Sequence, residues 1–360
     1  MDEEGRATGL SWTKDRGPAL SAERIGREQW LTFDSGGTTL TGRLSLPEGR
    51  GPHAAIVLVH GSGADAATEY HYNGDFLAAH GVAALTYDKR GTGRSGGTYT
   101  FDFHELASDA VAAVEYLKTR PEVDGRRIGL AGYSQGGWVA PLAASLTDDV
   151  RYVIVSYGLI DSPAEEARVE TRNTLRKRGV DEASLDQLDE LTLAAVRIVA
   201  TGFKQGWEEF GRLKRRYKRE PWVKQLSGTV VGKFVFYPRW VVKWLGPRNA
   251  PRDLPWYYDS PAVLEDLDVP MVWLLAEDDE SAPLELVLPA LRRFQAAGKP
   301  YEVIVFPGAD HSMLRFTEES GERTYTGYTP GYFEAEVQAA RRFSGLDWFF
   351  LTRLGLQNLP

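Results

Sequence analysis

Short, uninterrupted apolar runs alternate with segments of helical periodicity along most of this chain. Residues 54–59, 82–87, 127–131 and 152–156 are such runs. Runs of this length and composition are typical of strands buried on both faces of a parallel sheet. Stretches with helical spacing of their apolar residues, such as 103–120, separate them. The alternation predicts an α/β fold, with a mostly parallel sheet flanked by helices on both faces.

The alternation stops near residue 159 and resumes with the apolar runs 271–276 and 303–306. Between residues 163 and 252 there are 19 basic and 11 acidic residues, whereas the whole chain of 360 residues has a net charge of −8. Such a sharp change in composition indicates a separately built insertion. The predicted parts are an N-terminal extension (1–24), a first part of the core (25–159), a helical cap inserted after the sixth strand (160–262) and a second part of the core (263–360).

Composition excludes several classes of function. The chain has no cysteine, which removes disulfides, thiolate nucleophiles and Cys-ligated metal centres. Its net negative charge gives no reason to expect nucleic acid as a partner. No run approaches 18 apolar residues, so we expect no membrane partner. The acidic start, residues 1–5, has no apolar run behind it, which predicts a cytoplasmic protein without a signal peptide.

One strand–turn–helix motif carries a candidate nucleophile. The run 127–131 leads into Gly132-Tyr133-Ser134-Gln135-Gly136, after which a helix is expected. A Gly-x-Ser-x-Gly turn in this setting lifts the serine hydroxyl to the tip of the strand. A second match, centred on Ser95, neither follows a strand nor precedes a helix. We therefore predict that Ser134, and not Ser95, is the nucleophile.

A serine hydroxyl needs a base to take its proton, and the base needs an acid to orient it. Of the six histidines, only His311 follows Ser134, which is the order typical of this strand–turn–helix arrangement. His311 lies just past the run 303–306, on a predicted loop. Four carboxylates, residues 277–280, follow the run 271–276, and the sequence alone does not select one of them.

An oxyanion that forms on the substrate needs two backbone N–H donors. One predicted donor is Gln135, directly after Ser134. The other is Ser62, in the sequence His60-Gly61-Ser62-Gly63 that follows the run 54–59. Glycines on both sides of Ser62 allow the backbone to turn toward the nucleophile.

Together these motifs resemble the α/β-hydrolases, most of all serine esterases similar to the dienelactone-hydrolase and prolyl-oligopeptidase-like branches. The motifs are HGSG at 60–63, DKRGTGRS at 88–95, GYSQGG at 132–137, AEDD at 276–279 and GADHS at 308–312. The resemblance selects Asp279 as the acid, although Ala276 stands where such sequences more often have glycine. It also implies that His60 and Arg90 shape loops. Dienelactone hydrolases usually have a cysteine nucleophile, so a dienelactone substrate is not expected.

The resemblance implies a cofactor-independent serine hydrolase that cleaves a carboxylic ester through an acyl-enzyme. Ser134 would attack the substrate, His311 would carry the proton and Asp279 would hold the imidazole. The expected partner is a small-molecule ester or acyl substrate, with no cofactor and no metal. One alternative is the same chemistry on a thioester or an amide. Another is a non-catalytic binding protein with a hydrolase fold.

The predicted cap combines many aromatic residues with a strongly basic stretch, 212–219. Most of the aromatics must pack the cap itself, and a few are expected to line an apolar substrate pocket. Two interpretations of the basic charge are open. The cap's Arg and Lys side chains pair with the acidic core, or the basic stretch attracts an anionic substrate. We favour the first, because a run of charge is usually a solvated face.

Overall fold

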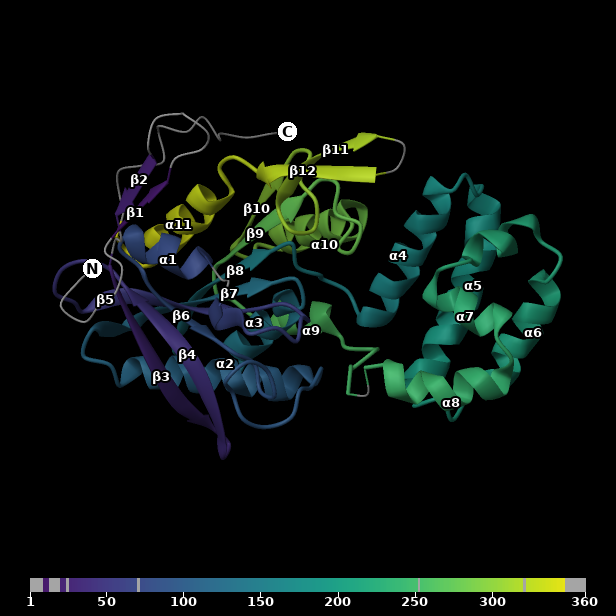
Figure 1. Cartoon of the computed structure of the whole chain (residues 1–360), viewed down its shortest axis with the longest axis horizontal. Helices are drawn as coiled ribbons and strands as arrows, with labels where there is room; N and C mark the ends of the chain where they lie inside the picture. Colours follow the sequence, from purple (N-terminus) through teal and green to yellow (C-terminus); the bar gives the residue numbers. More distant parts are fainter. Residues whose placement is uncertain are drawn as a thin grey trace.

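A sheet of eight strands forms the centre of the computed structural model (Figure 1), which describes residues 9–12, 20–23, 26–69, 72–251, 253–319 and 322–346. Its strands lie in the order β10-β9-β8-β7-β5-β6-β4-β3. Five neighbouring pairs from β10 to β6 are parallel, and β4 and β3 complete the sheet as antiparallel strands. The strands are β3 (Arg27–Ser35), β4 (Thr38–Leu46), β5 (His53–Val59), β6 (Ala83–Tyr87), β7 (Val123–Tyr133), β8 (Val150–Ser156), β9 (Met271–Ala276) and β10 (Tyr301–Phe306). The predicted mostly parallel sheet is confirmed.

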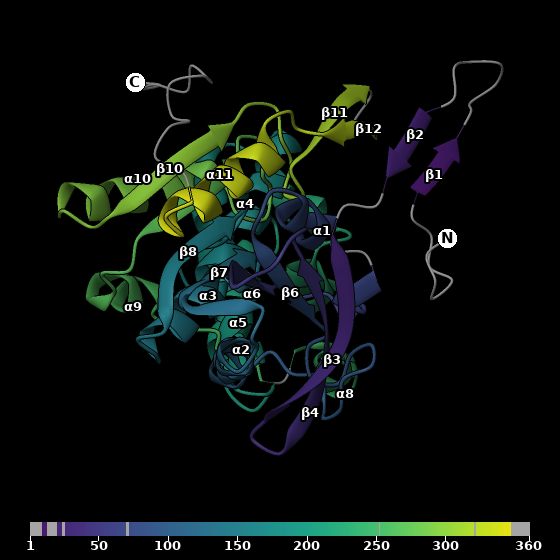
Figure 2. The ribbon, with the colours of Figure 1, turned by 90° about the vertical axis from the view of Figure 1, so that its left-hand side faces the viewer.

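Helices cover both faces of this sheet, which explains why its strands are apolar throughout. In β5, Val57 belongs to the core on one face, whereas Ile56 and Leu58 belong to the core on the other. Figure 2 shows α2 and α11 on opposite sides of the sheet. One face carries α2 (Phe103–Lys118), α3 (Gly136–Ser145), α9 (Ser260–Asp266) and α10 (Leu284–Ala296), and the other carries α1 (Tyr72–Ala79) and α11 (Tyr332–Phe343).

Residues 163–249, here called the helical segment, lie beside the sheet rather than against its faces (Figure 1). They follow β8, the sixth strand of the central sheet along the chain, and precede α9. The segment has a hydrophobic core of its own, to which Trp207, Phe210, Trp222 and Phe234 contribute. Its helices are α4 (Pro163–Lys177), α5 (Glu182–Ala200), α6 (Trp207–Tyr217), the 3₁₀ helix Pro221–Leu226, α7 (Val230–Phe236) and α8 (Arg239–Asn249).

The apolar spacing of residues 332–351 predicts a closing helix there, but α11 ends at Phe343. Gly345 adopts a φ of 69°, and a glycine in this left-handed region just past a helix ends it. The described residues stop at 346, so the rest of the expected helix lies outside them. The hairpin formed by β11 (Leu314–Glu319) and β12 (Glu322–Tyr328) was not predicted.

The N-terminal region expected as an extension contains a pair of short strands. β1 (Gly9–Trp12) and β2 (Leu20–Glu23) pair with each other in antiparallel fashion and form a separate two-stranded sheet. The remainder of residues 1–24 lies outside the described part of the chain.

Candidate active site

Ser134 occupies a sharp turn between β7 and α3. Its φ of 52° lies in the left-handed region, which non-glycine residues seldom adopt. A Cβ at Gly132 would lie 2.1 Å from the carbonyl oxygen of Gly136, and a Cβ at Gly136 would lie 2.2 Å from that of Val59. Both positions therefore require glycine. The N–H of Ser134 donates to the carbonyl oxygen of Ser156 at 3.1 Å, which ties the turn to the end of β8.

The structure brings Ser134, His311 and Asp279 together in a chain of hydrogen bonds. Ser134 Oγ and His311 Nε2 are 2.8 Å apart, and His311 Nδ1 is 2.9 Å from each carboxylate oxygen of Asp279. The Asp279 side chain is only 1% exposed, whereas that of His311 is 27% exposed. Backbone N–H groups of Ser281 and Ala282 donate to Asp279 at 2.9 and 2.7 Å, and they hold the carboxylate in place.

The three other carboxylates in this run have different surroundings. Glu277 accepts the backbone N–H of Gly308, from the loop after β10, at 3.0 Å. Glu280 pairs with Lys177 from α4 and with Arg323 from β12, each at 2.5 Å. The Asp278 residue is exposed. Of the four candidates left open by the spacing, Asp279 alone contacts the imidazole in the described structure.

The loop that carries His311 is shaped by the residue before it. Asp310 is buried, and one of its carboxylate oxygens accepts the backbone N–H groups of Ser312 and Leu314, each at 2.9 Å. The ring of Tyr157, just after β8, meets the imidazole edge-on at a centroid distance of 5.3 Å. These contacts fix the position of the imidazole beside Ser134.

The predicted oxyanion donors lie on two segments that approach Ser134. A Cβ at Gly61 would lie 3.2 Å from the Cβ of Ser134, so the loop containing Ser62 passes close to the serine. Gln135 is buried and begins the turn into α3. Negative charge is favoured at this end of a helix, because its first N–H groups are free to donate.

A buried lysine connects these two segments. Lys89 Nζ donates to the carbonyl oxygen of Gly61 at 2.7 Å and to the side-chain oxygen of Gln135 at 3.4 Å. The hydroxyl of Tyr99 donates to the carbonyl oxygen of Ser62. Lys89 is only 3% exposed, and burial lowers the pKa of its ammonium to about 8. Sequence reasoning did not single out Lys89 or Tyr99.

Ser95 has a structural position in the turn after β6. Its hydroxyl donates to the carbonyl oxygen of Asp88 at 2.7 Å and accepts the N–H of Thr41 at 2.8 Å. Both contacts are to backbone groups, so this hydroxyl ties the turn to β4. The imidazole of His311 contacts the other serine of the two Gly-x-Ser-x-Gly matches, Ser134.

Arg90 and His60 contact neighbouring loops and helices. Arg90 forms a two-fold ion pair with the buried Asp109 of α2, at 2.5 and 2.8 Å, and also contacts Glu105. His60 Nε2 accepts the backbone N–H of Lys89 at 3.3 Å. Both residues therefore connect neighbouring segments near the site.

Two carboxyl groups on α4 approach the site, and sequence reasoning missed them. Glu166 and Glu170 are four residues apart and share one face of α4. Neither side chain has a hydrogen bond or an ion pair within the described ranges. Burial raises the pKa of Glu166 to about 8, with the charges of Glu170 and Asp279 adding to the rise. Burial also raises the pKa of Glu170, against the opposing effect of His311.

Within the described residues, five of the eleven arginines of the helical segment pair with its own carboxylates, namely Arg168, Arg172, Arg176, Arg197 and Arg216. Arg168 and Arg172 both contact Asp189, for example, at 2.5 and 2.6 Å. Among the described residues, two ion pairs join the segment to the rest of the molecule. They are Lys177–Glu280 and Arg176–Glu285, at 2.5 and 3.7 Å. The expected pairing with the acidic core is therefore limited to the end of α4.

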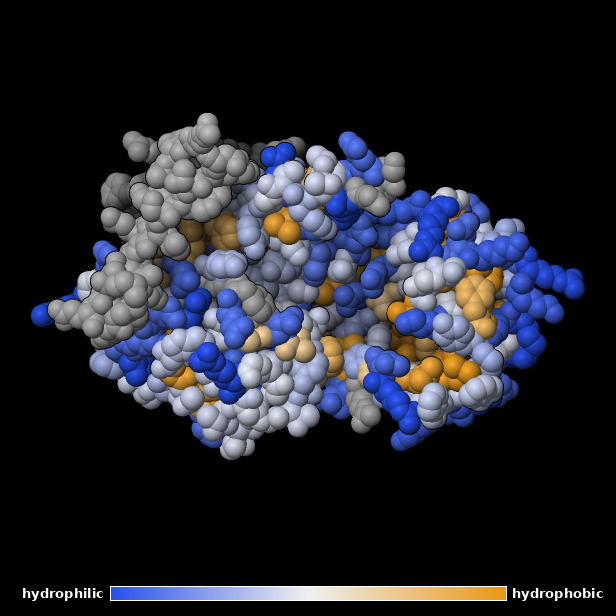
Figure 3. All heavy atoms as spheres, viewed as in Figure 1, coloured by the Kyte–Doolittle hydropathy of each residue, from blue (hydrophilic) through white to orange (hydrophobic). Residues whose placement is uncertain are grey.

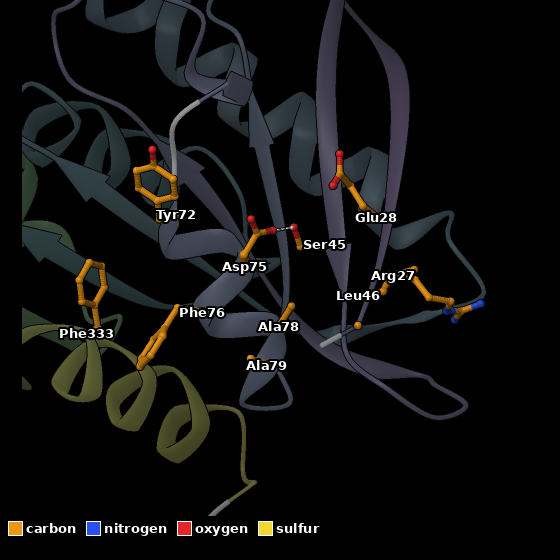
Figure 4. Close-up of a pocket in the computed structure, with 11 residues that line it drawn as sticks. Arg27, Glu28, Ser45, Leu46, Tyr72, Asp75, Phe76, Ala78, Ala79 and Phe333 are labelled. Atoms are coloured by element: carbon orange, nitrogen blue, oxygen red, sulfur yellow. Dashed lines mark hydrogen bonds between the residues drawn. The ribbon is translucent and has the colours of Figure 1, made fainter. Parts of the chain in front are cut away.

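One pocket is lined by residues other than Ser134, His311 and Asp279. It has a volume of about 430 Å³ and is lined by side chains such as Asp75, Phe76 and Phe333 (Figure 4). Neither Ser134 nor His311 lines it. Within the described ranges, no group of three or more His, Asp or Glu side chains could hold a metal ion.

The fold and the strand–turn–helix site define a class of proteins. Residues 56–324 match the Alpha/beta hydrolase family, and the chain belongs to this family. Curated relatives include hydrolases. The chain is 37% identical over 128 residues to the thiohydrolase apmlB of Arthrinium phaeospermum, a match that covers 35% of this chain and 40% of the relative. It is 31% identical over 150 residues to the esterase EstD of Thermotoga maritima, covering 39% of this chain and 36% of the relative.

These curated relatives are matched over less than half of their own length. Solved structures of the same fold extend over more of the chain. The alpha/beta hydrolase GrgF from a Penicillium species aligns with a TM-score of 0.54 at 20% identity, covering 88% of this chain and 98% of that one. The Pyrococcus furiosus esterase Pf2001 aligns with a TM-score of 0.51 at 18% identity, covering 79% and 84%. At these identities the likeness shows the fold alone.

Proposed function

We propose that this protein is a serine hydrolase that cleaves a carboxylic ester through an acyl-enzyme. The observation that carries the proposal is the alignment of three side chains from separate parts of the chain. Ser134 Oγ lies 2.8 Å from His311 Nε2, and the other imidazole nitrogen faces the buried Asp279 carboxylate. A hydroxyl, an imidazole and a carboxylate in this order form the arrangement that activates a serine for attack.

In the proposed reaction, His311 Nε2 takes the proton of Ser134 as Oγ attacks the ester carbonyl carbon. The carbonyl oxygen becomes an oxyanion, which the N–H groups of Gln135 and Ser62 stabilise. When the intermediate collapses, the bond to the alcohol oxygen breaks and His311 gives that oxygen its proton. Water then attacks the acyl-enzyme in the same way, which releases the carboxylic acid and restores Ser134. Asp279 holds the imidazole and stabilises its charged form throughout.

Lys89 and Tyr99 have a positioning role in this proposal. Each donates to a carbonyl of the loop that carries the Ser62 N–H, and Lys89 also contacts the Gln135 side chain. They do not contact the reacting atoms. Because a donor is effective only when it is already aimed at the oxyanion, fixing this loop before substrate arrives favours a fast chemical step.

A thioester is the second candidate substrate. The relative of higher identity among those described above is a thiohydrolase, although only 40% of that protein is matched. The same hydroxyl, imidazole and carboxylate would attack a thioester carbonyl in the same way. The nature of the leaving group therefore separates the two candidates.

Labelling with a fluorophosphonate tests whether the proposed nucleophile reacts. Wild type and Ser95→Ala should be labelled, and Ser134→Ala should not, with the modified peptide containing Ser134. Failure of the wild type to react would favour a non-catalytic binding protein. Hydrolysis of matched oxygen esters and thioesters with the same acyl group then decides the substrate class. A kcat/KM more than about tenfold higher for the thioester, a difference of about 1.4 kcal/mol in barrier, would contradict the ester proposal.

A further inference from the structure

One face of the helical segment exposes apolar side chains at unusual density. Of the 13 large apolar side chains that are exposed in the described part of the chain, six lie between residues 230 and 245. In Figure 3 apolar residues show at the surface over α7 and α8, with hydrophilic residues around them. These six residues and the basic residues of the same stretch are together called the aromatic–basic face. The apolar members are Val230, Phe236, Tyr237, Trp240, Trp244 and Leu245.

The helix α8 exposes its largest apolar side chains instead of burying them, unlike an ordinary surface helix. Trp240 and Trp244 are four residues apart, so they project from the same side of the helix. They are 71% and 58% exposed, whereas Val242 is the buried residue of α8 and packs into the core of the helical segment. A surface helix usually turns its largest apolar residues inward. Exposed apolar patches rimmed by polar residues mark contact sites for proteins or membranes.

The charge of this face has one sign. Residues 221–252 contain six basic residues and no Asp or Glu. Those within the described ranges form no ion pair with a carboxylate there. Arg248 instead lies over the ring of Trp244, with its guanidinium carbon 4.9 Å from the ring centroid. The cations of the face are Lys224, Lys233, Arg239, Lys243 and Arg248.

This composition selects among the possible occupants of the face. A second copy of the chain, packed on it by a two-fold axis, would bring two sets of unpaired cations together, and like charges repel. A lipid surface with anionic headgroups can accommodate the exposed apolar side chains and can also pair with the cations. Trp, Tyr and Phe side chains enter the boundary between headgroups and acyl chains, while Lys and Arg extend to the phosphates.

We propose that the aromatic–basic face docks this protein on the surface of an anionic lipid bilayer. The contact is peripheral. No helix in the described part of the chain is long and apolar enough to cross a membrane. The expectation that a membrane would not be a partner was based on the lack of a long apolar run, and a surface contact of this kind does not need one. The proposal is independent of the ester hydrolysis proposed above.

Sedimentation of the full chain with lipid vesicles tests the proposal. Vesicles of phosphatidylcholine with about 30% phosphatidylglycerol should bind the protein, and vesicles of pure phosphatidylcholine should bind it at least about tenfold more weakly. Binding should weaken as salt rises, because headgroup attraction is screened. Trp240→Ala/Trp244→Ala should lower the affinity at least about tenfold. The matched control is Trp30→Ala, since Trp30 is 45% exposed on β3 and lies away from the face.

A second pair of variants separates charge from folding. Lys243→Glu/Arg248→Glu should also lose binding, whereas Arg292→Glu/Arg293→Glu, with exposed side chains on α10, should retain it. Melting temperatures and hydrolysis of a soluble ester show whether each variant is folded. Equal binding to neutral vesicles, equal losses in the control variants, or no vesicle binding would overturn the proposal. A dimer in solution that Trp240→Ala/Trp244→Ala dissociates would assign the face to a second copy instead.

Discussion

The ammonium of Lys89 lies 2.7 Å from the carbonyl oxygen of Gly61, which belongs to the loop that approaches Ser134. Lys89 is almost fully buried, so it loses most of its hydration to make this contact. A charged donor in such a place holds its acceptor strongly. The relationship therefore connects the turn after β6 to the proposed oxyanion donors.

Removing the Lys89 ammonium should slow the chemical step without weakening substrate binding. We expect Lys89→Met to lower kcat by about 10- to 100-fold while KM changes by less than about twofold, because only the oxyanion position depends on the loop. Lys89→Arg should restore part of the rate. Lys204→Met, a change of an exposed lysine in the helical segment, serves as the control. Equal effects on kcat and KM would indicate a general structural role instead.

The same contact predicts an alkaline limb in the pH profile. Burial lowers the pKa of Lys89 to about 8, so its positive charge is present below this pH and is lost as the pH rises through it. The rate of ester hydrolysis should therefore fall above about pH 8. In Lys89→Arg the limb should move to higher pH, because the guanidinium keeps its proton. An unchanged limb in this variant would assign it to another group.

Neighbouring carboxylates provide a matched test of the acid. Asp279→Asn should lower kcat by about 10²- to 10⁴-fold, because the amide can present a donor to His311 Nδ1 and favour the wrong tautomer. Asp278→Asn should leave kcat within about twofold, since the Asp278 residue is exposed and does not contact the imidazole. Similar losses in both variants, measured with the same soluble ester, would remove Asp279 from its proposed role.

A buried carboxyl beneath the turn should make stability depend on pH. Glu336 of α11 accepts hydrogen bonds from the Tyr133 hydroxyl and from the Asn73 amide, and burial raises its pKa to about 7. A raised pKa favours the protonated form in the folded state, so stability is lost as the pH rises from about 4.5 through 7. The loss amounts to at most about 3 kcal/mol.

The neutral variant Glu336→Gln should escape this loss. Its melting temperature relative to wild type should increase between pH 5 and 8, values that bracket the titration of a carboxyl with a pKa of about 7. A constant difference between the two proteins across this range would show that Glu336 does not titrate there.

The two α4 carboxyls should discriminate against anionic substrates. Burial raises the pKa of both carboxyls; the charge of Asp279 adds to the rise at Glu166, and His311 opposes it at Glu170, so both groups lie close enough to influence the site. Above about pH 8, where Glu166 is ionised, Glu166→Gln/Glu170→Gln should raise kcat/KM for an anionic ester several-fold, relative to a neutral ester of the same size. A basic stretch that attracts anions would instead give the wild type a preference for the anionic ester, with no gain in the variant.

Features encoded over short distances could be predicted from the sequence. The apolar runs gave the strands of the sheet, and the pair Gly132 and Gly136 indicated the sharp turn at Ser134. His311 and Asp279 follow strands β10 and β9, which are parallel neighbours. Loops after neighbouring parallel strands meet at one edge of the sheet, so the topology brings these residues together.

Features that depend on distant partners could not be predicted. The Glu336 carboxyl meets Asn73 from a helix 263 residues away in sequence, and nothing near it indicates a buried charge. Lys89 looked like one residue of a polar turn, yet its contacts reach Gly61 and Gln135. The β11–β12 hairpin was missed because its residues are mostly polar and exposed, without an apolar run. In each case the information lies in what the side chain meets after folding.

The backbone conformation at Ser134 also limits which other residues could replace the proposed nucleophile. At a φ of 52°, a side chain branched at Cβ is strongly disfavoured. Threonine, the residue chemically most similar to serine, is therefore a poor replacement here. Cysteine and aspartate differ more from serine in chemistry. Apart from Cα, each has only one heavy atom attached to Cβ, however, so neither is disfavoured in this way. Under mutation, this site would move more easily to a thiolate or a carboxylate nucleophile than to a second hydroxyl.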